Sequence, residues 1–197
     1  MQIPSKFYTE FAGKITNQRW NAFSLIYENL RGLTTPLVII ETGIARKLND
    51  WDQDGNSTAL WNYIAKERNG KYIGIDIDSA AIELCKKNFP DGEYICADSI
   101  TALRSLPALS EASLLYLDSY DLDVGNPQPA AIHNTGELLA AYSALPSGCL
   151  IAIDDSNISM GNNGIADSGK NLISKYVLQF LNATRLDDGY IQVWQKP

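Results

Sequence analysis

The segment from Leu37 to Gly43, LVIIETG, constrains the fold of this chain more than any other stretch. It is an apolar, β-branched run that closes on an acidic residue and a glycine, which is how the first strand of an open α/β sheet ends at a ligand loop. A dinucleotide site also needs the pattern G-x-G-x-x-G, so that the backbone can approach a pyrophosphate. Here the letters IAR follow Gly43, so that phosphate-binding pattern is absent.

Strand and helix patterns alternate along the rest of the chain. After the first strand, further buried strands are expected over 71–77, 93–97, 113–118 and 149–153, and helices over 58–68, 79–88, 130–145 and 172–180. Such alternation predicts a parallel sheet with right-handed crossovers. Asp188 and Gly189 lie between two β-prone runs, which predicts a final hairpin.

Residues 4–33 have a helical pattern and lie outside the predicted sheet. Trp20, Phe23, Tyr27 and Leu30 recur at spacings of three and four, which places them on one apolar stripe. We expect this stripe to pack against the domain; a lid over the substrate and a dimer face are the alternatives.

Acidic residues and a glycine follow the first three predicted strands in a fixed order. Glu41 and Gly43 close the first strand, Asp76 ends the second, and Asp98 and Ser99 follow the third. An acid at the end of the second strand of a nucleoside-binding α/β fold accepts hydrogen bonds from ribose hydroxyls. The ordered set resembles that of the class I S-adenosylmethionine (SAM) methyltransferases, from about residue 36 onward. The resemblance implies that these five residues bind SAM, with Asp98 accepting a hydrogen bond from the adenine amine.

The same resemblance implies an architecture. We expect an α/β fold with a Rossmann-like, doubly wound sheet of seven strands in the order 3-2-1-4-5-7-6, with the last strand antiparallel. Residues 1–35 are expected to form a helical extension and residues 36–197 the core of a single domain. A chain of 197 residues is long enough to bury one full hydrophobic core.

Three aspartates follow the fourth and fifth predicted strands. Asp118 ends the fourth strand, and Asp154 and Asp155 end the fifth. These strand ends are neighbours in the expected order, so the carboxylates would repel each other unless a cation or protons intervened. Oxygen ligands of this kind suit a divalent cation such as Mg²⁺. The arrangement resembles the catechol-type, metal-dependent O-methyltransferases, in which the cation holds substrate oxygens and acidifies a hydroxyl. The alternative is that these acids only cap helices and loops.

The catechol-type family carries a lysine base shortly after its first metal aspartate, and here the letters SYDLD stand in that region. His133, the only histidine of the chain, is the candidate substitute because it titrates near neutrality. Glu137 lies four residues later on the same helical face and could orient the imidazole. Lys170 and Tyr120 are weaker candidates for the base.

The loop after the first strand contains a partial calcium motif. Asp50, Asp52 and Asp54 with Gly55 reproduce the first half of a calcium-binding loop. The twelfth position is Trp61 in place of the bidentate glutamate, and a strand precedes the loop. We therefore expect this loop to be acidic and solvated, and to close over the cofactor without holding structural calcium.

Charge and composition limit the partners. The net charge of −7 argues against nucleic acid as the main partner, because binding a phosphate backbone needs a basic face. The first residues lack the apolar run of a signal peptide, and no later run is long enough to span a bilayer. Cys85, Cys96 and Cys149 lie in apolar segments without metal spacing and are expected to be reduced core residues of a cytoplasmic protein.

The sequence therefore predicts SAM-dependent methyl transfer, with a small-molecule hydroxyl as acceptor and a divalent cation as helper. A metal-independent methyltransferase is one alternative, in which the three aspartates position a polar or cationic substrate. A SAM- or nucleoside-binding module without catalysis is another. A glycosyltransferase that uses Asp76 and Asp78 as a D-x-D metal motif is more distant.

Overall fold

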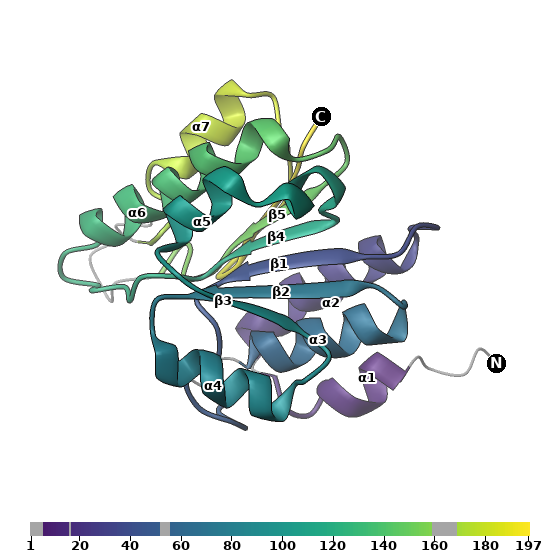
Figure 1. The fold of residues 1–197 in the computed structure, drawn as a ribbon. Coiled ribbons are helices and arrows are strands. Elements are labelled where there is room, and N and C mark those ends of the chain that lie inside the picture. The colour runs from purple at the N-terminus through teal and green to yellow at the C-terminus, as the bar shows by residue number, and fades with distance from the viewer. Residues whose placement is uncertain (1–5, 16, 52–55, 159–168) are drawn as a thin grey trace.

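The computed structural model describes residues 6–15, 17–51, 56–158 and 169–197, which form a twisted sheet covered by helices on both faces (Figure 1). The sheet has seven strands in the order β3-β2-β1-β4-β5-β7-β6. These are β1 (Val38–Thr42), β2 (Lys71–Asp76), β3 (Glu93–Cys96), β4 (Leu114–Leu117), β5 (Leu150–Ile153), β6 (Thr184–Asp188) and β7 (Gln192–Gln195). The pairs among β1 to β5 are parallel, and β7 is antiparallel to both of its neighbours, so the predicted order is confirmed.

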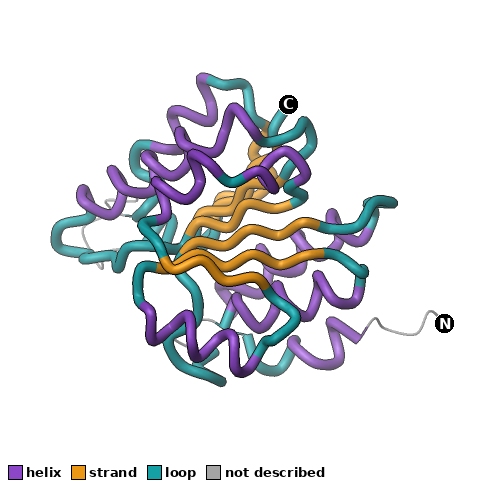
Figure 2. Tube along the Cα trace, in the orientation of Figure 1, coloured by secondary structure: helices purple, strands orange, loops and turns teal. Residues whose placement is uncertain are grey.

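The helices form a layer on each side of this sheet (Figures 1 and 2). One layer contains α1 (Lys6–Phe11), α2 (Asn17–Arg31), α3 (Ser57–Glu67) and α4 (Ser79–Asn88). The other contains α5 (Ser99–Ser105), α6 (Gln128–Ala141) and α7 (Ser174–Phe180), with the short 3-10 helices η1 (Pro107–Glu111) and η2 (Tyr142–Ala144). Both faces of the central strands are therefore buried, which explains why they are almost continuously apolar in sequence.

The apolar stripe of the N-terminal segment packs against the sheet, as expected. Phe23, Tyr27 and Leu30 of α2 are buried, and Phe7 of α1 stacks on Tyr27 with ring centroids 4.0 Å apart. Residues 4–33 were predicted as a single helical stretch, whereas the structure has two helices joined by a turn around Gly13.

Cys85 and Cys149 are buried free thiols, but Cys96 is exposed at the end of β3, so the prediction of a core position was wrong for that residue. Asp52, Asp54 and Gly55 of the partial calcium motif lie outside the described residues. In the part of the chain that the structure describes, no helix has the length and apolar character needed to cross a membrane.

Candidate active site

A cavity of about 550 Å³ lies at the carboxyl ends of the parallel strands. Its volume is in the range of small-molecule and cofactor sites, and this edge is where open α/β sheets bind ligands. The segments after β1, β2, β3, β4 and β5 all contribute to its wall, together with α2, α6 and the segment before α7. The predicted cofactor residues Gly43, Asp76, Asp98 and Ser99 all line it.

Gly43 lies where β1 meets the cavity, and its backbone requires glycine. Its φ is +74°, and a Cβ at this position would lie 2.6 Å from the backbone carbonyl group of Asp118. The turn after β1 therefore runs directly against the end of β4. Any side chain here would clash with the backbone at the end of β4, so only glycine permits this turn.

Asp76, at the end of β2, fixes the loops on either side of the cavity. Its Oδ2 accepts a hydrogen bond from the Ile44 N–H at 3.0 Å, and its Oδ1 accepts one from the Asp78 N–H at 2.8 Å. An ionised carboxylate has about four acceptor sites, so Asp76 can still accept from hydroxyl groups of a ribose. Asp78 is the N-cap of α4, its Oδ1 accepting from the Ala80 N–H at 2.8 Å, which accounts for the D-x-D spacing without a metal.

Asp98 caps the N-terminus of α5. Its Oδ1 accepts hydrogen bonds from the backbone N–H and the hydroxyl of Thr101, at 2.8 and 2.7 Å. These bonds lower the pKa of Asp98, which keeps it an ionised acceptor at the edge of the cavity. The next residue, Ser99, is buried, and its hydroxyl lies 3.0 Å from Nε2 of His133.

Glu41 does not line the cavity, which corrects its predicted role in cofactor contact. Its fully buried carboxylate lies beneath the turn after β1 and accepts hydrogen bonds from the hydroxyls of Thr58 and Tyr72. The Thr58 hydroxyl in turn accepts one from the Ala45 N–H at 2.9 Å. Burial raises the pKa of Glu41 to about 7, against the effect of these hydroxyls. Glu41 therefore supports the loop after β1 through Thr58.

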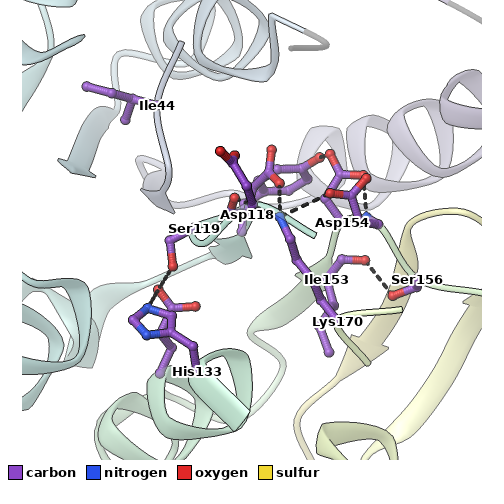
Figure 3. Close-up of polar contacts among 12 residues, drawn as sticks. Ile44, Asp118, Ser119, His133, Ile153, Asp154, Ser156 and Lys170 are labelled. Atoms are coloured by element: carbon purple, nitrogen blue, oxygen red, sulfur yellow. Dashed lines mark hydrogen bonds and ion pairs between the residues drawn. The ribbon is translucent and has the colours of Figure 1, made fainter. Parts of the chain in front are cut away.

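Asp118 and Asp155 both line the cavity, but a lysine lies between them. Figure 3 shows the ammonium group of Lys170 at Asp118 and the acids at the end of β5. Its Nζ is 2.8 Å from Asp118 Oδ1 and 3.1 Å from Asp155 Oδ2. Among the described residues, no group of three or more acid, histidine or cysteine side chains is arranged to hold a metal ion. The predicted divalent cation is therefore not supported, because an ammonium group occupies the position between the acids.

Asp154 faces away from the cavity, although it was predicted as a third metal ligand. β5 ends at Ile153, and Asp155 has a φ of +49°, so only Asp155 of this pair lines the cavity. The Asp154 carboxylate is buried beneath the sheet, where its Oδ2 accepts a hydrogen bond from Tyr116 at 2.6 Å and lies 3.5 Å from Nε of Arg19. Its role is structural, as an ion pair with the N-terminal helix layer.

His133 projects from α6 into the cavity (Figure 3). Its Nε2 lies 3.7 Å from Oε1 of Glu137, which is fully buried and accepts a hydrogen bond from Ser119 at 2.5 Å. The nearby Glu137 carboxylate raises the pKa of His133 above its ordinary 6.5, while partial burial opposes the rise. The Tyr120 ring lies 5.3 Å from the imidazole, on a backbone with φ +65°. The predicted pairing of His133 with Glu137 is thus present in the structure.

Lys170 is not suited to be the base. Burial alone would lower the pKa of its ammonium group, but Asp118 and Asp155 outweigh burial and raise it. A lysine held charged in this way cannot accept a proton near neutrality.

Some residues of the site carried no recognisable signal in the sequence. Arg19 lies in an amphipathic helix, where an arginine is expected on the solvent side, and Tyr190 lies in a hairpin turn. Arg46 pairs with Asp121 at 2.9 and 3.0 Å, which joins the loop after β1 to the loop after β4. Only the fold brings these segments together.

No protein-family model matches the sequence, and no curated protein matches it. Solved structures do match. A candidate rRNA methylase from Clostridium thermocellum is 17% identical with a TM-score of 0.61, over 93% of this chain and 99% of that one. A candidate methyltransferase from Streptococcus mutans, in complex with SAH, is 13% identical with a TM-score of 0.59, over 93% of this chain and 99% of that one. The MycE methyltransferase of the mycinamycin biosynthetic pathway, in complex with Mg and SAH, is 12% identical with a TM-score of 0.62. The match covers 98% of this chain and 52% of that one. The chain therefore has the fold of the class I SAM-dependent methyltransferases.

Proposed function

We propose that this chain binds SAM and transfers its methyl group to a hydroxyl oxygen of a small molecule, with His133 accepting the proton. The observation that carries the proposal is the single cavity shared by Gly43, Asp76 and Asp98 on one side and by Asp118 and His133 on the other. The first three residues have the chemistry that an adenosine group needs, a cradle without a side chain and two acceptor carboxylates. The last two lie where a second reactant would meet it.

Different residues of the cavity would hold the cofactor and accept the proton. SAM, when bound, supplies a methyl group activated by a positively charged sulfur. Asp76 would hold the ribose hydroxyls and Asp98 the adenine amine, which fixes the direction in which that methyl group points. The imidazole of His133 would take the proton of the acceptor hydroxyl, and the buried carboxylate of Glu137 would stabilise the resulting imidazolium. Ser99 and Ser119 position the imidazole and the carboxylate through hydrogen bonds.

The class of acceptor follows from charge. The structural neighbours include a candidate rRNA methylase and an enzyme of a mycinamycin pathway. A net charge of −7 disfavours a polyanion, so a small molecule is the better proposal for this chain. The wall of the cavity that would meet the acceptor contains both signs of charge, in Arg46, Asp121, Asp155 and Lys170.

Calorimetry with SAM and with SAH tests the proposal. We expect the wild-type chain to bind both, and Asp76→Ala to lose about 1–3 kcal/mol of affinity, or roughly 5- to 150-fold, for the loss of hydrogen bonds to a charged group. Asp91→Ala is the matched control, because Asp91 is an exposed acid that pairs with Lys66 outside the cavity. A wild-type chain that binds neither compound would refute the proposal. An unchanged affinity in folded Asp76→Ala would refute the role of Asp76.

A further inference from the structure

We infer that Lys170 is a positioning residue whose ammonium group takes the place of a divalent cation between the ends of β4 and β5. The inference concerns the same cavity as the proposed function, but it does not depend on methyl transfer. Cation binding at this position can be measured on the chain alone, without SAM or an acceptor.

The contacts of the ammonium group are those of a built site. Nζ donates to the Asp118 carbonyl oxygen at 2.9 Å and to Asp118 Oδ1 at 2.8 Å, and it lies 3.1 Å from Asp155 Oδ2. Three oxygens thus match the three N–H donors of the ammonium group. The Lys170 side chain is only 2% exposed, so bulk water cannot replace these partners. Charge and hydrogen bonding are both satisfied without a further ion.

The backbone delivers Lys170 to this position independently of its side chain. The Lys170 N–H donates to the Asp155 carbonyl oxygen at 3.0 Å. At Gly169 a Cβ would lie 2.5 Å from the same carbonyl oxygen and 2.9 Å from the Asn157 nitrogen, so this segment lies directly on the end of β5. Asn171 then bonds to Asn157 at 3.2 Å. The residues on both sides of the lysine therefore anchor it to the strand end.

The negative charges of Asp118 and Asp155 are compensated because Lys170 lies between them. Asp118 and Asp155 would repel each other if no cation lay between them. Lys170 lies 2.8 Å from the first and 3.1 Å from the second, and the Tyr190 hydroxyl also donates to Asp155. Without the lysine, two carboxylates and a backbone carbonyl would converge on an empty position. That set of oxygens is what Mg²⁺, Mn²⁺ and Ca²⁺ prefer.

The inference predicts that removing the ammonium group creates a cation site. We expect the wild-type chain to show no saturable Mn²⁺ binding at this position by electron paramagnetic resonance. Lys170→Ala should bind Mn²⁺ at least 10-fold more tightly than the wild type, and its melting temperature should rise when Mn²⁺ is added. Lys170→Arg keeps the positive charge and should behave as the wild type does.

Two controls locate the effect. Lys175→Ala removes another lysine close in sequence, on α7, and should leave Mn²⁺ binding as in the wild type. Lys170→Ala with Asp155→Asn should lose the binding gained by Lys170→Ala alone. A folded Lys170→Ala variant that gains no Mn²⁺ binding would overturn the inference. If that variant does not fold, Mn²⁺ binding is measured on the wild type and on Asp155→Asn. Wild-type binding that Asp155→Asn abolishes would overturn the inference, and the absence of such binding supports it. Failure of SAM binding would affect none of these readings, so the two proposals can fail separately.

Discussion

The guanidinium carbon of Arg19 lies 4.8 Å from the ring centroid of Tyr190, although 171 residues separate the two in sequence. The Tyr190 hydroxyl donates a hydrogen bond to Asp155, and Arg19 lies within 4.0 Å of both Asp154 and Asp155. The N-terminal helix layer and the final hairpin therefore meet at the end of β5. Arg19 and Lys170, which both line the cavity, hold the acids that follow this strand.

Arg19→Leu should be strongly destabilising. Removing one partner of a buried ion pair leaves the other charge without compensation, which costs about 3–5 kcal/mol. Arg31→Leu is the matched control on the same helix, because its side chain is 51% exposed and a surface substitution changes stability by about 0.5 kcal/mol or less. Urea unfolding of both variants measures the difference. Equal midpoints would show that the pairing of Arg19 with Asp154 contributes little.

His133 should titrate above pH 6.5, and Glu137→Gln should lower its pKa. The Glu137 carboxylate, 3.7 Å from Nε2, favours the imidazolium, so the pKa of His133 is raised in the wild type and should fall when glutamine replaces the acid. Since His133 is the only histidine, proton NMR of a tag-free chain reports its titration without assignment. If the pKa of His133 were unchanged in folded Glu137→Gln, Glu137 would not be the group that raises it.

We expect the same pair to set a pH dependence for the proposed methyl transfer. A general base works in its neutral form, so kcat should fall as pH drops below the raised pKa of His133. In Glu137→Gln this decline should begin at a lower pH. His133→Gln should reduce kcat about 100-fold or more and leave SAM affinity unchanged, because its contribution is to proton transfer. An acceptor assay over pH 5–9 checks both expectations, and a pH profile that His133→Gln does not alter would contradict them.

The local pattern of the sequence was enough to predict the sheet and to place Gly43, Asp76 and Asp98 along the cavity. Buried parallel strands are continuous apolar runs, and Gly43, Asp76 and Asp98 each follow such a run directly, so their place at the carboxyl edge follows from topology. The same pattern was not enough to predict how the acids after β5 are oriented. Both faces of β5 are buried, so the pattern does not tell which of Asp154 and Asp155 faces the cavity.

The cations of the site could be predicted less well. Arg19 reaches the acids only because α2 packs beneath the sheet, which is a tertiary contact without a local signal. Lys170 was recognised as a candidate, but as a base. Its burial between two carboxylates, which keeps it charged, depends on how residues 169–171 fold back on the end of β5.

Glu41→Gln should remove a pH dependence of stability. Burial raises the pKa of Glu41 from its ordinary 4.5 to about 7, so between these values the folded state binds more protons than the unfolded state. Stability therefore falls as pH rises through this window, by about 3 kcal/mol in total. The amide of Gln can still accept hydrogen bonds from Thr58 and Tyr72. Its variant should gain stability relative to the wild type as pH rises from 4.5 to 8.

Chemical unfolding at several pH values measures this difference. Glu93→Gln serves as the control, because the Glu93 side chain is 59% exposed and its variant should follow the wild type across the range. A Glu41→Gln curve parallel to that of the wild type would mean that Glu41 stays ionised in the folded chain.

The ion pair between Arg46 and Asp121 should affect cofactor release more than stability. Both side chains are exposed, at 51% and 81%, and exposed pairs contribute about 0–1 kcal/mol to folding. They join the loops after β1 and β4, and both line the cavity. We expect Asp121→Ala to speed SAM dissociation several-fold at low salt, with a smaller effect at high salt, where the pair is screened. Stopped-flow release kinetics measure the change, and equal rates would contradict the expectation.

β7 lies inside the sheet, between β5 and β6, although it is the last strand in sequence. A chain synthesised from its N-terminus exposes the other six strands before the strand that pairs with β5 and β6 has left the ribosome. Until then β5 keeps an open edge, and Tyr190, just ahead of β7, has not reached Asp155. The nascent chain therefore completes its sheet only after β7 has emerged from the ribosome.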